Sequence, residues 1–424
     1  MTSPDTTART AAETVLAGLD DVRSSLHGLY RHLHAHPELS MQEHETARLI
    51  ESHLAELGVA TFRCGGTGVV GVLENGPGPV VAFRADTDAL PIAEQTGLDY
   101  ASSATGVLAD GTETQVMHGC GHDTHTASLL ISATLLARSR HAWSGTIVLI
   151  FQPGEEIAAG ARAMVDDGLW DRAPRPDVVL GQHVGPEPAR TVQYRTGTSA
   201  SMADSWQVTM FGRGAHGSQP HLSVDPIVQV AHTITRIQTI AAREVDPMDS
   251  AVVTIGRIAG GMKENVIPDS TMFTVNVRTF DEQVRERVLD SLRRIITAEA
   301  AASGAPEPLI TELSTFPRLV NDEATTTRVM TALGEFWGPD SVGEGQLLMG
   351  SEDFGVLGEA AGAPYCFWFI GGTDPELYAK AEAAGTIPSS VAGNHSPFFA
   401  PEIEPTLSRM VEAAVVGMVT FLHD

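Results

Sequence analysis

Five short polar motifs end, or directly follow, apolar segments that have the length of one buried strand. The motifs are RADTDALP (84–91), HGCGHD (118–123), FQPGEE (151–156), GQHV (181–184) and GNHSP (393–397). Ligand sites in open α/β sheets gather at the carboxyl ends of the strands, so motifs that are distant in the chain can converge there. The pattern therefore favours a fold in which one edge of a sheet collects the polar chemistry.

Helical and strand patterns alternate through the first and last thirds of the chain. Apolar residues recur at helical spacing over 12–35, 44–58, 124–139, 159–168 and 403–422. Short continuous apolar runs lie between these helices, at 145–153, 177–184 and 364–372. We therefore predict an α/β domain with a mixed, largely parallel sheet and helices on both faces.

The pattern changes near residue 197 and returns near residue 307. The order between them is strand, helix, strand, strand, helix, which predicts a smaller α+β domain of the ferredoxin-like kind. A chain of 424 residues is also longer than one hydrophobic core usually organises. We expect a discontinuous larger domain from 1–196 and 307–424, with 197–306 inserted.

Charge and cysteine content restrict the partners. The chain has 27 Lys and Arg against 53 Asp and Glu, a net charge of -26, which argues against nucleic acid and anionic membranes. We see no apolar segment long enough to span a bilayer and no secretion signal. Three scattered cysteines, Cys64, Cys120 and Cys366, favour a reducing compartment. We expect a cytoplasmic protein that acts on a small molecule.

The motif HGCGHD fits neither a zinc finger nor a redox dithiol, because Cys120 has no second cysteine at the required spacing. The five motifs together offer a thiolate, imidazoles and carboxylates, which suit zinc, or else manganese, cobalt or nickel. Five ligands exceed the need of one tetrahedral site with an open position, so we expect two divalent ions that share a water. The expected donors are Cys120, His122, Glu156, His183 and His395, with Asp86, Asp88 and Glu155 nearby.

The chain resembles the M20 metallopeptidases, and more narrowly the M20D amidohydrolases, from about Leu29 to its end. The motifs that carry the resemblance, in this order, are RADTDALP, MHGCGHDTHTA, FQPGEE, GRGAHGSQPH, ENVIPDS and NHSP. The resemblance implies that the five donors above bind the metals, that Glu155 is the general base, and that the insertion is a lid. Many relatives have His-x-Asp where this chain has Asp86 and Asp88, and we interpret both as residues that orient ligands.

The resemblance further implies hydrolysis of the amide bond in N-acyl-L-amino acids, as in aminoacylases. His216 and Asn265 match lid residues that approach the substrate, and His216 is expected to donate to the oxyanion. Arg278 and Asn265 are candidates for holding the substrate carboxylate, because a guanidinium binds carboxylates in two-pronged fashion. A homodimer or homotetramer formed through the lid is also implied.

Several alternatives stay open. On the same scaffold, the activity of an N-acetyl-diaminopimelate deacetylase, a hippurate hydrolase or a carbamoylase is possible. An amidase with Cys120 as nucleophile and His122 as base, or a metal-binding module without activity, are alternatives from other classes. Structural roles are the simpler interpretation for the histidines of HLHAH (32–36), for His118 and for His125, and Asp353 fits either the surface or the cleft.

Overall fold

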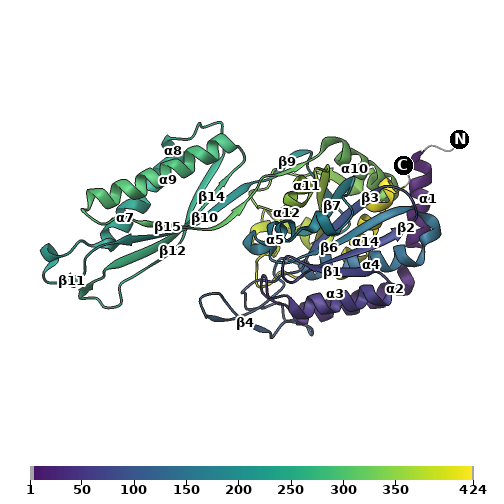
Figure 1. Cartoon of the computed structure of the whole chain (residues 1–424), viewed down its shortest axis with the longest axis horizontal. Helices are drawn as coiled ribbons and strands as arrows, with labels where there is room; N and C mark the ends of the chain where they lie inside the picture. The colour runs from purple at the N-terminus through teal and green to yellow at the C-terminus, as the bar shows by residue number, and fades with distance from the viewer. Residues whose placement is uncertain (1–3, 423–424) are drawn as a thin grey trace. The chain divides into compact units, whose positions relative to one another are not determined.

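The computed structural model describes residues 4–422, and the chain divides into two compact units (Figure 1). The first unit contains the chain up to Ser199, Val320–Leu347 and the chain from Asp353 onward, and the second contains Ala200–Leu319 and Leu348–Glu352. The second unit extends beyond the predicted insertion of 197–306, because a further strand after residue 306 pairs within its sheet. The outermost residues of the predicted larger domain, 1–3 and 423–424, lie outside the described residues.

An eight-stranded mixed sheet forms the centre of the first unit. Its strands, in spatial order, are β1 (Ala60–Cys64), β2 (Gly68–Asn75), β6 (Gly145–Gln152), β3 (Val80–Asp86), β7 (Val178–Pro188), β18 (Tyr365–Thr373), β8 (Val192–Tyr194) and β17 (Val342–Glu344). The central neighbours β6, β3, β7 and β18 run parallel, whereas β1, β2 and β8 pair in antiparallel fashion. This confirms the mixed, largely parallel sheet.

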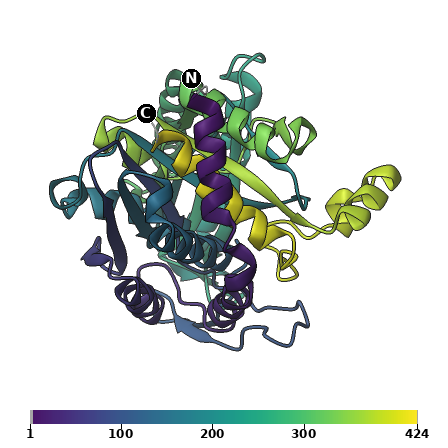
Figure 2. The same ribbon diagram turned by 90° about the vertical axis from the view of Figure 1, so that its right-hand side faces the viewer.

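Helices cover both faces of this sheet (Figures 1 and 2). Leu180 packs toward Gly417 on one face, and a Cβ on the neighbouring Gly181 would lie 2.8 Å from the ring of Phe354 on the other. Successive strand residues point to opposite faces, so the helices that contain or follow Gly417 and Phe354 lie on opposite sides. The helices of this unit are α1 (Pro4–Leu16), α2 (Leu19–Ala35), α3 (His44–Glu56), α4 (His122–Arg138), α5 (Gly160–Asp166), α6 (Leu169–Arg172), α10 (Glu323–Trp337), α11 (Gly355–Ala361), α12 (Pro375–Ala384), α13 (Ile387–Ser390) and α14 (Thr406–Phe421).

The parallel strands explain why polar side chains lie together at one edge of the first unit's sheet. Ile147 to Phe151 of β6 are fully buried, as expected for a strand with both faces covered. Asp86 at the end of β3 pairs with Gln152 at the end of β6, and Arg84 pairs with Gly181 of β7. The motifs that follow these strands therefore meet at one edge of the sheet.

The second unit is a four-stranded antiparallel sheet with helices α7 (Pro226–Ile237) and α9 (Glu282–Ala302) packed on it. The strands, in spatial order, are β12 (Ala251–Gly260), β14 (Ser270–Thr279), β10 (Met202–Phe211) and β15 (Leu309–Phe316). Their chain order is β10-α7-β12-β14-α9-β15, which is the order of elements in a ferredoxin-like unit. Asp225 and Asp281 begin the two helices by accepting hydrogen bonds from amides of the first turn.

Short elements complete the two units. They are α8 (Thr239–Arg243), the pair β4 (Thr105–Val107) and β5 (Glu113–Gln115), the pair β11 (Ala215–His216) and β13 (Val266–Ile267), and the pair β9 (Gly197–Ala200) and β16 (Leu319–Asn321). Within residues 4–422, no helix is both long enough and apolar enough to cross a bilayer.

His34 accounts for the buried part of the HLHAH motif. Its ring contacts the carboxylates of Asp123 at 2.7 Å and Glu94 at 3.1 Å, and its side chain is 1% exposed. His32 and His36 are exposed, so the motif does not gather its three imidazoles. Burial disfavours a charge on His34, but the hydrogen bonds with Asp123 and Glu94 outweigh burial and raise its pKa from 6.5 to about 10.

We predict that this ion pair makes stability depend on pH. Because the folded-state pKa is raised, the stabilisation is fully present below pH 6.5 and is lost as the pH rises toward 10. The urea midpoint of the wild type should exceed that of His34→Gln most at the acidic end of this range, and the difference should shrink with rising pH. A difference that stays constant across the range would mean that His34 is neutral in the folded protein.

Candidate metal centre

The predicted metal-binding motifs converge at one edge of the first unit's sheet. Asp86 ends β3 and Asp88 follows it, His122 begins α4, Glu155 and Glu156 follow β6, and His183 lies on β7. Gly121 has a φ of 86°, and a Cβ there would lie 2.4 Å from Val184, so a glycine is required where the chain enters α4. His395 comes from the loop before α14, and its amide donates to the carbonyl of Gly119 at 2.7 Å.

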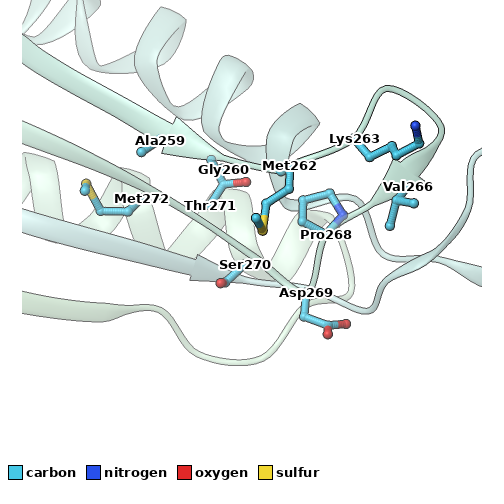
Figure 3. A pocket seen from close by; sticks show the side chains of 11 residues that line it. Ala259, Gly260, Met262, Lys263, Val266, Pro268, Asp269, Ser270, Thr271 and Met272 are labelled. Carbon is cyan, nitrogen blue, oxygen red and sulfur yellow. The ribbon is translucent and has the colours of Figure 1, made fainter.

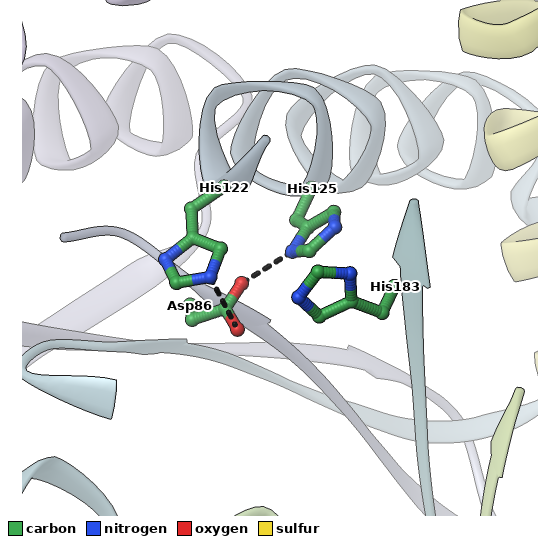
Figure 4. Close-up of side chains that lie close together, drawn as sticks. All are labelled: Asp86, His122, His125 and His183. Carbon is green, nitrogen blue, oxygen red and sulfur yellow. Dashed lines mark hydrogen bonds and ion pairs between the residues drawn. The ribbon is translucent and has the colours of Figure 1, made fainter. Parts of the chain in front are cut away.

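His122 presents a nitrogen lone pair to the cluster. Its Nδ1 lies 2.9 Å from the carbonyl oxygen and 3.2 Å from Oδ1 of Asp88. Both partners are acceptors, so Nδ1 carries a proton, and Nε2 is the nitrogen whose lone pair a metal ion can use. Nε2 is buried without a hydrogen-bond partner among residues 4–422, and Asp86 Oδ2 lies 3.5 Å from it (Figure 4). An imidazole held in this way is typical of a metal ligand.

His183 and His125 lie beside each other but differ in what they can bind (Figure 4). His183 donates from Nδ1 to the carbonyl of Val184 at 2.7 Å, which leaves its Nε2 lone pair 3.5 Å from Cys120 Sγ. His125 bonds Asp86 through Nδ1 and accepts the Val184 amide at Nε2. With both nitrogens engaged, His125 has an orienting role, whereas His183 keeps a donor atom for a cation.

Cys120, Glu156 and His395 form the other part of the cluster. One donor atom from each lies within 4.8 Å of the other two. Glu156 Oε2 lies 3.3 Å from His395 Nε2, and its Oε1 lies 4.0 Å from His122 Nε2. Donor atoms of Glu155, Glu156 and His122 also lie within 4.8 Å of one another. The structure thus brings all five predicted donors, and Glu155, into one connected cluster.

The charges of the cluster favour a bound cation. Burial, together with the carboxylates of Glu156 and Glu155, raises the pKa of the Cys120 thiol well above its usual 9.0. Burial disfavours a charge on His122, but Asp86 and Asp88 outweigh burial and raise its pKa to about 10. Without a cation a proton therefore occupies Nε2, and a bound metal ion would replace that proton. The pKa of His183 falls well below 6.5 because of burial and the nearby His125. A divalent ion would balance the carboxylates and favour the thiolate.

The residues present fit a metal site by their chemistry. His122 Nε2 and Glu156 Oε1 are buried without hydrogen-bond partners in the described part of the chain, although buried polar atoms are nearly always partnered. Thiolate, imidazole and carboxylate donors together suit zinc and its neighbours among the transition metals. The cluster can therefore hold metal ions, with Glu155 beside them.

Asp86 and Asp88 each hold several groups of the cluster. Asp88 accepts from His122 Nδ1, from Ser40 Oγ at 2.6 Å and from the Glu156 amide at 3.1 Å. Asp86 accepts from His125 and from Arg84 Nη1 at 2.7 Å. These contacts support our hypothesis that both aspartates orient ligands.

Arg84 and Asn394 have structural roles at the site that the sequence did not predict, and Asp353 has a third such role. Arg84, fully buried, bonds Asp86, Gln152 and Asp353, and an arginine inside an apolar strand was a usable signal for a buried acidic partner. Asp353 is buried and accepts from Gln152 at 2.7 Å, so its open assignment is resolved in favour of the interior. Asn394 donates to the carbonyls of Cys120 and Val184 at 3.0 and 3.1 Å, a contact that no local pattern indicates.

His118 behaves differently from His125. It is buried, and neither ring nitrogen has a hydrogen-bond partner within residues 4–422. Burial lowers its pKa to about 4, so the ring is neutral at physiological pH. The structure therefore shows no capping hydrogen bond for His118.

The remaining predicted site residues belong to the second unit. His216 is exposed on β11, and its Nδ1 accepts from the amide and hydroxyl of Ser218 at 3.1 and 2.7 Å. Asn265 precedes β13, and its carbonyl accepts from the Gly217 amide at 2.7 Å. Arg278 on β14 donates to the carbonyl of Met349 at 2.7 Å and to Ser351 Oγ at 3.2 Å.

The second unit also contains a hollow of about 620 Å³ between the ends of β12 and β14 (Figure 3). Met262, Pro268 and Met272 are part of its lining, with Lys263 and Asp269 as the charged residues. None of the predicted metal ligands lines this hollow. The metal cluster and the hollow are therefore separate features.

A cluster of thiolate, imidazole and carboxylate donors at the strand ends of an α/β unit defines a metal-binding protein. The sequence profile of peptidase family M20/M25/M40 matches residues 82–384, and the chain belongs to this family. The chain is 40% identical over 317 residues to the N-acetyl-L-cysteine deacetylase of Bacillus subtilis (strain 168), covering 74% of this chain and 73% of that protein. It is 35% identical over 350 residues to the hippurate hydrolase of Campylobacter jejuni, covering 82% and 88%.

A solved structure shares the fold. The dinuclear metal-binding peptidase of family M20 from Bacillus subtilis aligns with a TM-score of 0.71 and 30% identity, over 95% of this chain and 99% of that one. The predicted resemblance to M20D-type amidohydrolases is thereby confirmed. The protein is a metal-dependent enzyme that hydrolyses amide bonds in small molecules.

We predict that Asp88→Ala weakens metal binding without unfolding the protein. The substitution removes the acceptor for His122 Nδ1 and for the Glu156 amide, and loss of such a supporting contact typically costs roughly 10- to 100-fold in metal affinity. Competition with a zinc chelator measures the change. Asp166→Ala, at an exposed position of α5, is the matched control and should bind metal as the wild type does. Equal affinities in both variants would remove Asp88 from the supporting role.

Proposed function

We propose that the enzyme hydrolyses the amide bond of N-acyl-L-amino acids, with Glu155 as the general base. The observation that carries this proposal is the placement of Glu155. Glu155 directly precedes Glu156 in the chain. Its carboxylate is buried and has an oxygen within 4.8 Å of donor atoms of both His122 and Glu156. A base must reach the proton of a water held at the metal cluster, and the position of Glu155 beside the donor atoms supports this role.

Cys120, His122, Glu156, His183 and His395 would hold two divalent ions, zinc first among the candidates and manganese, cobalt or nickel after it. When bound, such ions polarise the scissile carbonyl and lower the pKa of the attacking water. Glu155 takes a proton from this water as it attacks and later delivers it to the leaving amine. Asp88 and Asp86 keep the ligands and the Glu156 backbone in place during the reaction.

Residues of the second unit complete the proposal. The two hydrogen bonds from Ser218 to His216 Nδ1 leave the proton of a neutral ring on Nε2, which suits donation to an oxyanion. Arg278 and Asn265 would hold the carboxylate of the substrate.

We further propose that the second unit acts as a lid and mediates a homodimer or homotetramer. In support, β12 is an edge strand with Val252 and Ile258 exposed.

The substrate class is supported by the names of relatives, which act on N-acetyl-L-cysteine and on hippurate. A screen of metal-loaded protein against N-acetyl-L-cysteine, N-acetyl-L-glutamine, hippurate and N-acetyl-L,L-diaminopimelate, read as amine release, separates the aminoacylase activity from those of a hippurate hydrolase and a diaminopimelate deacetylase. Treatment with EDTA should abolish activity and added metal should restore it. Activity that survives chelation would favour the alternative with Cys120 as nucleophile.

We predict that Glu155→Gln retains its metals and still binds substrate but loses several orders of magnitude in kcat. The amide cannot accept and return a proton, whereas the proposed ligands stay intact. Metal content by elemental analysis and kcat on the best substrate of the screen are the two measurements. If the variant loses its metal together with its activity, Glu155 is a metal ligand and Glu156 is the general base.

We predict that His216→Ala lowers kcat by a hundredfold or more, on the order of 3 kcal/mol, with little change in KM or metal content. A donor to the oxyanion acts on the transition state more than on the bound substrate. His221→Ala, which alters another exposed histidine a few residues along, is the control and should turn over normally. Wild-type turnover in His216→Ala would reduce this residue to a structural role in its loop.

A further inference from the structure

The segment Ser40–Glu43 lies between α2 and α3 and has no part in the proposed chemistry. It nevertheless contacts the site at two places, at Gly154 and at Asp88. Glu43 is fully buried, with 0% exposure, although a glutamate immediately before a helix is normally solvated. The buried carboxylate must therefore be held by several donors, and those donors show what the segment does.

Glu43 binds the backbone directly before Glu155. Its Oε1 accepts from the amides of Gly154 and Met41, both at 2.8 Å, and its Oε2 accepts from the Thr67 hydroxyl. The Gly154 carbonyl accepts from the amides of Ala159 and Gly160 at 3.2 and 3.1 Å. The residue that precedes the proposed base is thus fixed at both its N–H and its C=O.

Packing restricts the same residue further. Gly154 has a φ of 56°, in the left-handed region, and a Cβ there would lie 2.6 Å from the sulfur of Met41. Met41 itself has a φ of 63°, which is unusual for a residue with a side chain. The hydrogen bond from the Met41 amide to Glu43 stabilises this conformation. Met41 and Glu43 together therefore determine how the chain turns out of β6 toward Glu155.

Ser40 acts on the neighbouring group. Its hydroxyl donates to Asp88 Oδ2 at 2.6 Å, and the same oxygen accepts from the Glu156 amide at 3.1 Å. The segment thus fixes the chain before Glu155 through Glu43 and the chain at Glu156 through Ser40 and Asp88. Two independent contacts from one segment hold both glutamates of the PGEE motif.

We propose that Glu43 is a positioning residue for catalysis, because its hydrogen bond to Gly154 sets the orientation of the Glu155 carboxylate. The proposal rests on the proposed function of Glu155 as base. A carboxylate that is displaced by about 1 Å from its productive position can lose roughly a hundredfold in rate. Glu43 acts through Glu155 and does not touch the substrate.

Different substitutions of Glu43 distinguish the effect of its hydrogen bonds from the effect of its charge. In Glu43→Gln the amide oxygen can still accept from Gly154 and Met41, and the amide nitrogen can donate to Thr67, so kcat should stay near that of the wild type. Glu43→Ala should lower kcat by roughly 10- to 100-fold with unchanged KM and metal content. Glu43→Asp, one methylene too short to reach Gly154, should behave like the alanine variant and replaces it if that variant does not fold.

Glu38→Ala is the matched control. Glu38 accepts from the amides of Glu45 and Thr46 at 3.0 and 2.8 Å, so it supports the start of α3, next to Glu43, but its side chain has no hydrogen bond to Gly154. This variant should lose thermal stability at unchanged kcat. If Glu38→Ala lowers kcat as much as Glu43→Ala does, or if metal content falls with kcat in Glu43→Ala, the positioning role is overturned.

A double-mutant cycle tests whether Glu43 acts through Glu155. All rates are measured on the best of the four substrates in the screen above. In the Glu155→Gln background, Glu43→Ala should cause no further loss, because the group that it positions no longer transfers protons. The same fold loss in both backgrounds would overturn the positioning role alone. Full activity of Glu155→Gln itself would instead overturn the assignment of the base, and the positioning role with it.

Discussion

The central constraint on the first unit is that it holds several buried carboxylates close together at one edge of its sheet. Asp86, Asp88 and Glu155 are each at most 5% exposed, and their charges repel one another in a medium that screens poorly. Arg84 offsets part of this charge through contacts with Asp86 and Asp353. The remaining negative charge faces His122, His183 and Cys120. An edge of this kind is suited to divalent cations and is costly without them.

The hydrogen bonds around this edge fix the orientation of the donor side chains toward the cluster. Asp88 determines which nitrogen of His122 faces the cluster, and the Val184 carbonyl does the same for His183. Asn394 ties the Cys120 loop to β7, so the thiol and His183 keep their separation. Membership of the M20/M25/M40 family identifies the chemistry as amide hydrolysis. The supporting hydrogen bonds determine how firmly the donor side chains are held in position for it.

Much of the candidate site could be predicted because its residues follow buried strands. A parallel sheet brings strand ends together whatever the length of chain between them, so Glu156 and His183 could be assigned to one site without knowledge of the packing. Glu43 and Asn394 could not be assigned in this way. Their partners are backbone groups of distant segments, and a contact between a side chain and a remote backbone leaves no periodic pattern in the sequence.

The sequence by itself determined the α/β class, because the class depends on periodicity, and it predicted an inserted α+β unit and a set of donor residues from spacing and residue type. The tertiary structure decided where the second unit ends, since pairing of β15 with β10 depends on which strand edge is free. It also decided that both ring nitrogens of His125 are engaged by Asp86 and Val184, while His183 directs its Nε2 at Cys120. Both are histidines near the same cluster, and only the acceptors and donors around each ring distinguish them.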